Sequence, residues 1–372
     1  MPIYANITTE KYWNDIREIV RAGQSSTYLP VGKILYDTAD STTGTAFQVV
    51  GNNKHFDPDL TAQGYTNSIT LCQVKLDIRQ LDAIQAFIYL EKEMQAGVYR
   101  FTIPNYDAAN GGNKTYYFTT TKNVPIGGQV VLSWPSNQTP KNVSTYDSYT
   151  NATEIESSLT LTEWDSSVTV ENLGTISLST TITTSEYGKL NHIHRARYGS
   201  NNYAQSGIRQ ILNSNKLANQ WWQPTSIFSR PYGNRAVNGY LTTLNSDFVN
   251  VLGTPEITCI SNNTFEYQSL DGTTYPLNTT YTVRDKMFLL SHTEVNLSFS
   301  PNIGTVLDYY STHSSNSDRI KYRKDNNNAY YWWLRAPHPS HAHGERIVYT
   351  SGALINSYAN NSNGSAPACI IQ

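Results

Sequence analysis

The chain has 372 residues, which is enough for two or three domains with buried cores. Its formal net charge of −2 and the lack of a Lys/Arg cluster predict that it binds no nucleic acid, and no run of about 18 apolar residues is present to insert into a membrane. Aromatic residues make up 12% and charged residues 15%, a composition typical of a folded protein. The first residues lack the pattern of a signal peptide, so we expect synthesis in the cytoplasm.

Residues 9–22 show the spacing of an amphipathic helix that ends at Gly23. Its apolar stripe consists of Trp13, Ile16, Ile19 and Val20. A stripe of this kind has to be covered by other apolar groups. The helix either packs on its own domain or docks into a neighbouring subunit, as an attachment arm would, and the sequence leaves both open.

The following segments change from strand to helix patterns. Residues 31–36, 46–50 and 69–76 are rich in strand-forming side chains and are separated by Thr, Gly, Asn and Asp clusters. Apolar residues at near-helical spacing then predict a helix over residues 81–95, ended by Gly97.

Residues 98–185 predict a β-rich module. A hairpin is expected where residues 99–103 and 115–119 flank the Gly111-Gly112 turn. Further strands are expected at residues 129–134, 158–162, 168–170 and 175–182. Residues 135–153 are rich in Ser, Asn, Thr and Pro without periodicity, which predicts an exposed loop.

The remaining chain, residues 186–372, mixes helix and strand patterns. Helices are expected at residues 203–213 and 241–252, a meander of short strands at 255–282 and a buried strand at 287–290. An apolar aromatic run from residue 329 stops at Pro337 and predicts a central strand. A hairpin with a Ser351-Gly352 turn and a closing strand at residues 368–371 follow.

The cysteines predict no covalent framework. Cys72, Cys259 and Cys369 are odd in number and widely spaced, which fits neither a disulfide pattern nor a zinc knuckle. We expect all three to be buried thiols.

Several blocks of sequence resemble a known family. They are Trp332-Trp333-Leu334-Arg335-Ala336-Pro337, Ser351-Gly352, residues 360–364, Ala366-Pro367-Ala368, residues 198–214, residues 247–253 and residues 289–296. They resemble a domain family of unassigned function, common in phage and prophage proteins of Gram-positive gut bacteria. That family is related to the C-type-lectin-like fold of formylglycine-generating enzymes and retroelement-diversified receptor-binding proteins. The resemblance covers residues 190–372.

The resemblance implies an α+β fold with a C-type-lectin-like domain and a β-rich N-terminal or inserted module. Residues 1–27 would form an arm, residues 98–185 the inserted module and residues 186–372 the lectin-like domain. The strands within residues 28–97 would open the lectin-like domain, and we expect them to pair with the C-terminal sheet across the insertion.

Histidines form the sharpest candidate for metal chemistry. His338, His341 and His343 follow Pro337, with Glu345 beside them, and His-x-His spacing on an extended chain can present two imidazoles to one metal. On an exposed loop the same side chains serve equally as flat hydrogen-bonding contact groups. We predict no metal and no cofactor. The second pair, His192 and His194, is expected to be structural.

We do not expect an enzyme. Neither a Gly-x-Ser-x-Gly elbow, a Cys-x-x-Cys motif, a phosphate-binding Gly loop nor a His-Glu-x-x-His motif occurs. The cysteines do not match the reactive pair of formylglycine-generating relatives. The remaining catalytic alternative is a set of scattered carboxylates, such as Asp247, Asp285 and Glu294, which sequence alone cannot bring together.

Trp332 and Trp333 are adjacent in the predicted strand, so their side chains should face opposite sides of the sheet. We expect both to be core residues, although one of them could be a ligand platform. Arg335 is expected to fix a loop by hydrogen bonds to carbonyls or to a carboxylate.

The resemblance implies a phage virion structural protein whose lectin-like domain binds a host-surface carbohydrate or protein. The alternatives are a capsid decoration or head-fibre protein with a purely structural role, and a bacterial carbohydrate-binding or carbohydrate-processing protein. The expected partners are other virion proteins of the capsid or tail, the host ligand and further copies in a homo-oligomer, and the expected location is the virion.

The same resemblance places the ligand-binding face after the Trp-Trp-Leu-Arg strand. Its expected residues are His338, His341, His343, Tyr349, Asn356, Tyr358, Asn360 and Asn361. Alternation along a strand puts Arg346 and Tyr349 on opposite faces, so we expect Tyr358 and the histidine loop to contribute more than Arg346.

Overall fold

The protein is described by a computed structural model over residues 12–39, 43–81, 201, 203–218, 220–221, 237–260, 280–338 and 344–372. The backbone alone is described for short strands at residues 87–89, 97–107, 112–120, 129–133, 159–160, 162–163, 178–181, 192–194, 267–268 and 274–275. The predicted loop at 135–153 and the predicted strand at 168–170 lie outside these residues.

The first helix packs on its own domain. Helix α1 (Tyr12–Arg21) buries its predicted stripe, and the indole of Trp13 lies 4.4 Å from the ring of Phe248. The Trp13 Nε1–H also donates to the Asp37 carbonyl at 2.6 Å. The stripe is therefore covered within the chain, and α2 (Ser25–Tyr28) follows directly.

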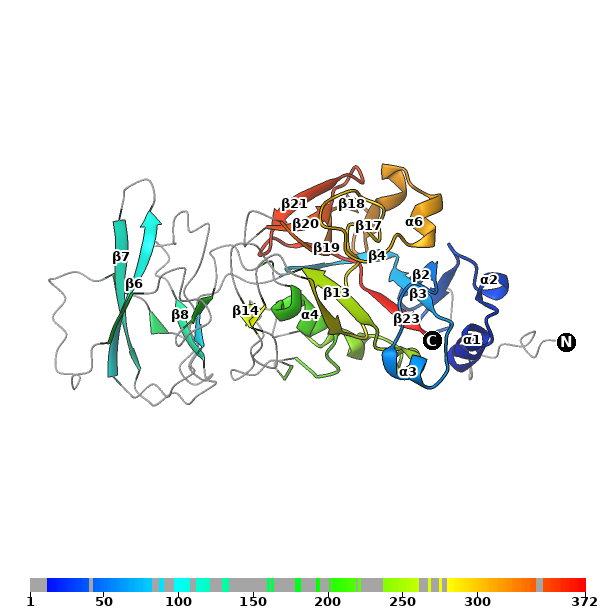
Figure 1. Cartoon of the computed structure of the whole chain (residues 1–372), viewed down its shortest axis with the longest axis horizontal. Coiled ribbons are helices and arrows are strands. Elements are labelled where there is room, and N and C mark those ends of the chain that lie inside the picture. The colour runs from blue at the N-terminus through cyan, green and yellow to red at the C-terminus, as the bar shows by residue number, and fades with distance from the viewer. Residues whose placement is uncertain are drawn as a thin grey trace.

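A four-stranded sheet joins the two ends of the described chain. Its order is β1 (Ile34–Tyr36), β2 (Ala46–Asn52), β3 (Ile69–Gln73) and β23 (Ala368–Ile371). In the register of β3 and β23, Leu71 faces Cys369. Figure 1 shows the C-terminus beside α1, and the Arg21 Nε–H donates to the Gln372 carbonyl. The expected pairing of the N-terminal strands with the C-terminal sheet is present.

A seven-stranded sheet carries the Trp-Trp strand in its interior. Its order is β18 (Ala329–Tyr330), β17 (Lys321–Arg323), β4 (Lys75–Arg79), β22 (Asn363–Ser365), β19 (Trp332–Pro337), β20 (Gly344–Val348) and β21 (Leu354–Tyr358). The single strand predicted over residues 69–76 is wrong. The chain turns at Val74, so that β3 and β4 enter different sheets.

Both tryptophans of β19 are buried core residues. Trp332 Nε1–H donates to the Arg319 carbonyl at 3.0 Å, and Trp333 Nε1–H donates to the Arg79 carbonyl at 2.8 Å. They join a continuous core with all three cysteines, which are buried and free as predicted. The fold is mixed α+β.

The helices are shorter than predicted. They are η4 (Tyr203–Gln205), α4 (Gly207–Leu212), η6 (Tyr240–Thr243) and α5 (Ser246–Val251), with α3 (Pro58–Ala62), α6 (Asp308–Thr312) and η7 (Asn316–Arg319) elsewhere. The helix expected over 241–252 divides because Leu244 is extended and the Asn245 side chain caps a new helix by accepting from Asp247 N–H.

Two further predictions fail. The helix expected over residues 81–95 is contradicted by strand β5 (Phe87–Tyr89), whose aromatic and β-branched residues favour a strand. Residues 287–290 are buried as expected, but they do not form the predicted strand. Their only β-type pairing among the described residues is an isolated bridge between Phe288 and Ala368. Leu290 accepts one further backbone bond, from Arg335 N–H, outside any regular ladder.

Smaller sheets complete the described elements. One contains β10 (Thr162–Glu163), β7 (Gly112–Thr120), β6 (Gly97–Asp107) and β11 (Leu178–Thr181), and another contains β12 (His192–His194), β5, β8 (Gln129–Ser133) and β9 (Leu159–Thr160). Two pairs are β13 (Glu256–Ile260) with β16 (Thr280–Arg284), and β14 (Tyr267–Gln268) with β15 (Thr274–Tyr275). The hairpin predicted around Gly111-Gly112 is confirmed by the β6–β7 register.

Of the helices in the described ranges, none combines the length and apolarity that a bilayer crossing requires.

The turn between β20 and β21 depends on Gly352. Its φ is +82°, and a Cβ at this position would lie 1.7 Å from the Asn316 carbonyl oxygen. Gly32 has φ +93° with open space around it, so Gly32→Ala reports the backbone cost alone, about 1–2 kcal/mol in the free energy of unfolding. We expect Gly352→Ala to cost about 1–3 kcal/mol more, measured by urea unfolding. Equal losses in the two variants would contradict the close approach.

Candidate functional site

Two of the predicted binding residues share the outer strand of the C-terminal hairpin. In β21, Asn356 pairs with Arg346 and Tyr358 pairs with Gly344 of β20. Asn356 and Tyr358 are exposed, Tyr358 by 45%, and their spacing of two residues puts them on one face of the strand. They form a surface, here called the hairpin face, that a partner can contact.

Arg346 belongs to the hairpin face because it lies directly across from Asn356. Its guanidinium carbon is 3.8 Å from the centre of the Phe299 ring, close enough for a cation–π interaction. Burial lowers the pKa of Arg346 from its ordinary value. Arg346 thus supports this face as a half-buried residue.

Tyr349 lies elsewhere, at the turn end of the hairpin, where its N–H donates to the Ala353 carbonyl. The ring centres of Tyr349 and Tyr331 are 5.3 Å apart. The ring centres of Tyr331 and Tyr330 are 4.5 Å apart. We call Tyr330, Tyr331 and Tyr349 the tyrosine cluster. About five strand residues, or roughly 16 Å, separate it from Tyr358, so the structure divides the predicted site in two.

The other predicted residues lie close to Tyr358 in sequence. Asn361 N–H donates to the Tyr358 carbonyl at 2.9 Å, which closes a tight turn. Asn360 is half-buried, and its carbonyl accepts from Gln80 Nε2–H at 2.6 Å. His338 is half-buried and donates its N–H to the Gly344 carbonyl. His341 and His343 lie outside the described residues.

Glu345 is a buried acid inside the hairpin. Among the described residues, no hydrogen-bond donor reaches either of its carboxyl oxygens. Burial raises the pKa of Glu345 well above its ordinary value, and the nearby Arg346 charge opposes this only in part. Burial therefore favours the neutral form of this carboxyl group, which can donate as well as accept a hydrogen bond.

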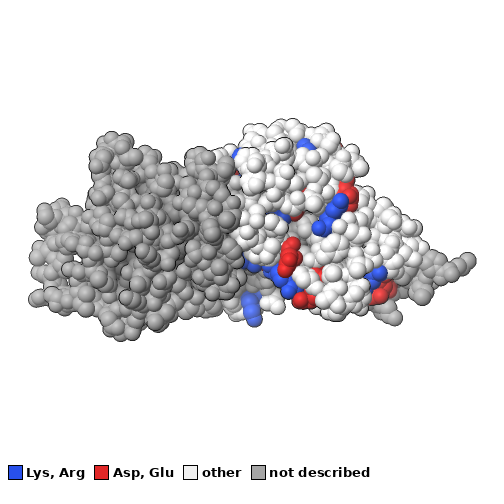
Figure 2. Space-filling view, viewed as in Figure 1, with Lys and Arg blue, Asp and Glu red and all other residues white. Residues whose placement is uncertain are grey.

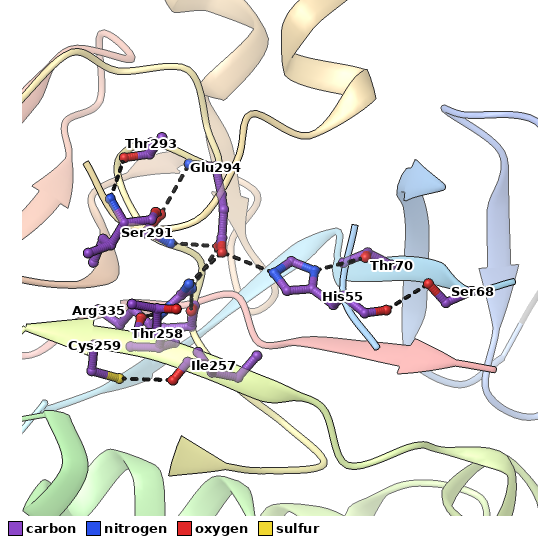
Figure 3. A network of polar contacts seen from close by, with 12 residues as sticks. His55, Ser68, Thr70, Ile257, Thr258, Cys259, Ser291, Thr293, Glu294 and Arg335 are labelled. Atoms are coloured by element: carbon purple, nitrogen blue, oxygen red, sulfur yellow. Dashed lines mark hydrogen bonds and ion pairs between the residues drawn. The ribbon is translucent and has the colours of Figure 1, made fainter. Parts of the chain in front are cut away.

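A second buried acid, Glu294, is fully paired instead (Figure 3). Its carboxylate accepts two hydrogen bonds from the guanidinium of Arg335 and one from His55 Nε2 at 3.0 Å. Ser291 N–H donates to Glu294 Oε2 at 2.9 Å, and the other ring nitrogen of His55 lies 3.0 Å from the Thr70 hydroxyl. Burial would raise the pKa of Glu294, but the charges of Arg335 and His55 outweigh it and the pKa is lowered.

Arg335 fixes the chain around it, as the sequence predicted. Its Nε–H donates to the Thr258 carbonyl at 2.9 Å and one Nη1–H donates to the Leu289 carbonyl at 2.6 Å. The Arg335 and Glu294 side chains are almost completely excluded from solvent. This arrangement is an internal ion pair that is almost completely buried.

The carboxylates named as a catalytic alternative do not form one centre. Asp285 pairs with Arg209 at 2.9 Å in the interior, Glu294 pairs with Arg335, and Asp247 is exposed at the start of α5. Burial raises the pKa of the Cys259 thiol to about 12, so it is not a ready nucleophile. Within the described ranges, no group of three or more His, Cys, Asp or Glu side chains is placed to hold a metal.

Sequence reasoning missed Tyr330 and Tyr331 as surface aromatics. They precede the buried Trp pair, and an unbroken apolar run gives no sign of where burial ends. On the face of the molecule that Figure 2 shows, the described surface carries small patches of both charge signs and is otherwise uncharged.

The paired state of Glu294 makes stability depend on pH. We expect Glu294→Gln to lower the free energy of unfolding at pH 7 by about 3–5 kcal/mol, because it leaves the Arg335 charge buried without its partner. The native pKa of Glu294 is lowered, so the wild-type advantage is present above the unfolded-state pKa of about 4.3 and is lost as the pH falls through the native pKa. Urea unfolding at pH 7, 5 and 3 should show that the difference in the free energy of unfolding between wild type and Glu294→Gln becomes smaller at low pH.

The control for this experiment is Glu18→Gln. Glu18 is exposed and lies 3.6 Å from Arg17 and from Arg21, so the change should cost at most about 1 kcal/mol. A gap between wild type and Glu294→Gln that stays constant from pH 7 to pH 3 would argue against the pairing.

Comparison with known proteins gives one match. Neither a curated protein nor a solved structure matches the chain. The family described as "Domain of unknown function (DUF6273)" matches residues 176–372, more than half of the chain, and these residues hold α4, α5, β13 and all strands from β16 to β23. The chain therefore belongs to the DUF6273 family.

Proposed function

We propose that this protein is a virion structural protein of a phage or phage-like element, and that its C-type-lectin-like domain binds a carbohydrate or protein on the host surface. The observation that carries the proposal is the hairpin face. Asn356 and Tyr358 are exposed on a strand whose neighbours, β20 and β19, are anchored in the core. Tyrosine and asparagine supply contact area and adaptable hydrogen bonds at binding surfaces.

The lectin-like part of the proposal draws support from the topology. The N-terminal β3 pairs with the C-terminal β23, so the two ends of the chain close one sheet, and β4 joins the hairpin sheet through β22. Such closure fits a domain that carries a long insertion and displays loops at one end. The virion context rests on the sequence resemblance, and the partners that follow are capsid or tail proteins and further copies of the chain.

A purely structural role is the second candidate. Strand β21 ends the order of the seven-stranded sheet, and strands in this position can pair with a strand of another subunit. In that case the hairpin face packs between copies as a capsid decoration or head fibre.

A double variant separates the two roles. We expect Asn356→Ala with Tyr358→Ala to lower adsorption of particles to host cells about tenfold, while the free energy of unfolding changes by under about 0.5 kcal/mol per site, since both side chains are exposed. The matched control is Tyr322→Ala: Tyr322 is 44% exposed, but it lies on β17 near the opposite edge of the sheet. Unchanged adsorption with a folded double variant and normal particles would favour the structural role.

A further inference from the structure

Strand β21 ends the seven-stranded sheet, and its register shows which of its backbone groups face away from that sheet. Tyr349 N–H donates to the Ala353 carbonyl, so this pair at the turn is a hydrogen-bonded one. The β20–β21 register continues from there without a shift. Bonded and non-bonded pairs alternate in an antiparallel ladder. Leu354, Asn356 and Tyr358 therefore direct their backbone N–H and C=O groups away from β20.

A second hydrogen bond agrees with this direction. The carbonyl of Gly344, which pairs with Tyr358, accepts from His338 N–H and so points away from β21. Among the described residues, none bonds the outward backbone groups of Leu354 or Asn356. Asn356 is also exposed. The middle of β21 thus offers unused donors and acceptors along an accessible edge.

The other edges of the seven-stranded sheet and of the sheet β1-β2-β3-β23 are better protected. Strand β18 has two residues, and β1 has three and follows Lys33. Strand β23 is covered where Gly253 N–H donates to the Ile370 carbonyl. Short strands, charges, prolines and covering segments are the means by which proteins keep edges from pairing. Strand β21 has five residues without a charge, a proline or a bulge, so its edge is open to another strand.

The sequence of β21 is complementary to itself. A two-fold axis beside Asn356 places this residue opposite Asn356 of the partner subunit, in a hydrogen-bonded pair that uses the outward groups of both. Leu354 then lies opposite Tyr358 of the partner subunit, and aliphatic–aromatic pairs of this kind stabilise sheets. Because β21 carries no charge, two copies meet without repulsion between the paired strands.

We propose that the protein forms a two-fold symmetric dimer in which the β21 strands of two copies pair antiparallel, with Asn356 at the centre. The inference identifies the partner strand in the structural role considered above, and it does not depend on host attachment. Backbone edges make the contact, so the side chains of the hairpin face remain on the surface of the joined sheet. Two hairpin faces then lie side by side, which suits a repeated ligand.

Gel filtration with light scattering tests the dimer on the full-length protein. We expect a mass twice that of the 41.7-kDa chain, which falls towards that of one chain on dilution. Asn356→Pro removes the central N–H and should raise the dissociation constant of the dimer at least about tenfold. Asn356→Ala keeps this N–H and should dimerise as wild type, which separates backbone pairing from side-chain contact.

Charged variants test the register. Asn356→Lys and Asn356→Asp should each be monomeric, because the two-fold axis places like charges directly opposite each other. An equimolar mixture of the two variants should form a heterodimer at low salt. The matched control is Asn302→Lys, which adds the same charge at an exposed asparagine outside β21 and should leave the wild-type dimer intact.

Thermal unfolding checks that the variants are folded. The Asn356 side chain is exposed and its N–H makes no bond to β20, so Tm should stay unchanged in each variant. If Asn356→Pro does not fold, the charged pair still decides. A monomeric wild type, a folded Asn356→Pro variant with wild-type dimer affinity, or a mixture of the charged variants that stays monomeric would each overturn the inference. Host attachment is tested separately, by adsorption of particles to host cells.

Discussion

The ion pair of Arg335 and Glu294 is the constraint on which the described fold depends. Two charges are stable in an interior only when they pair and their remaining hydrogen-bonding capacity is used. Here the partners come from β19, from residues 289–294, from β13 through Thr258 and from the β2–β3 connection through His55. The ion pair thus ties together segments that are far apart in the sequence.

This dependence explains why the N-terminal strands cannot be a separate unit. The DUF6273 match begins at residue 176, yet β3 pairs with β23 and β4 lies between β17 and β22. A chain cut at that boundary would leave β23 without its partner strand and the ion pair without His55. The matched family region and the physical folding unit are therefore different, because pairing joins residues about 300 positions apart.

The sequence predicted those elements that depend on side-chain patterns within a short segment. The α1 stripe, the β20–β21 hairpin and the burial of Trp332 and Trp333 follow from periodicity and turn chemistry. The helix over residues 81–95 failed because near-helical apolar spacing does not outweigh strand-forming residues such as those of β5. The candidate site was only partly predictable. Neighbours in sequence such as Tyr349 and Tyr358 lie at opposite ends of a hairpin, and no local pattern predicts that β4 pairs with β22.

The interior holds two buried glutamates in opposite states: Glu294 is fully paired by the chain, whereas Glu345 has no hydrogen-bond donor among the described residues. Arg335, His55 and the Ser291 N–H all contact the Glu294 carboxylate, and removing Arg335 would leave its charge unpaired. Glu345 is held by its place in β20, and none of the described residues donates to its carboxyl oxygens. Such atoms reduce stability, and a fold with a strong buried ion pair can tolerate that cost. The Arg335–Glu294 pair therefore stabilises the packing of distant segments, whereas the buried Glu345 carboxyl lowers the free energy of unfolding.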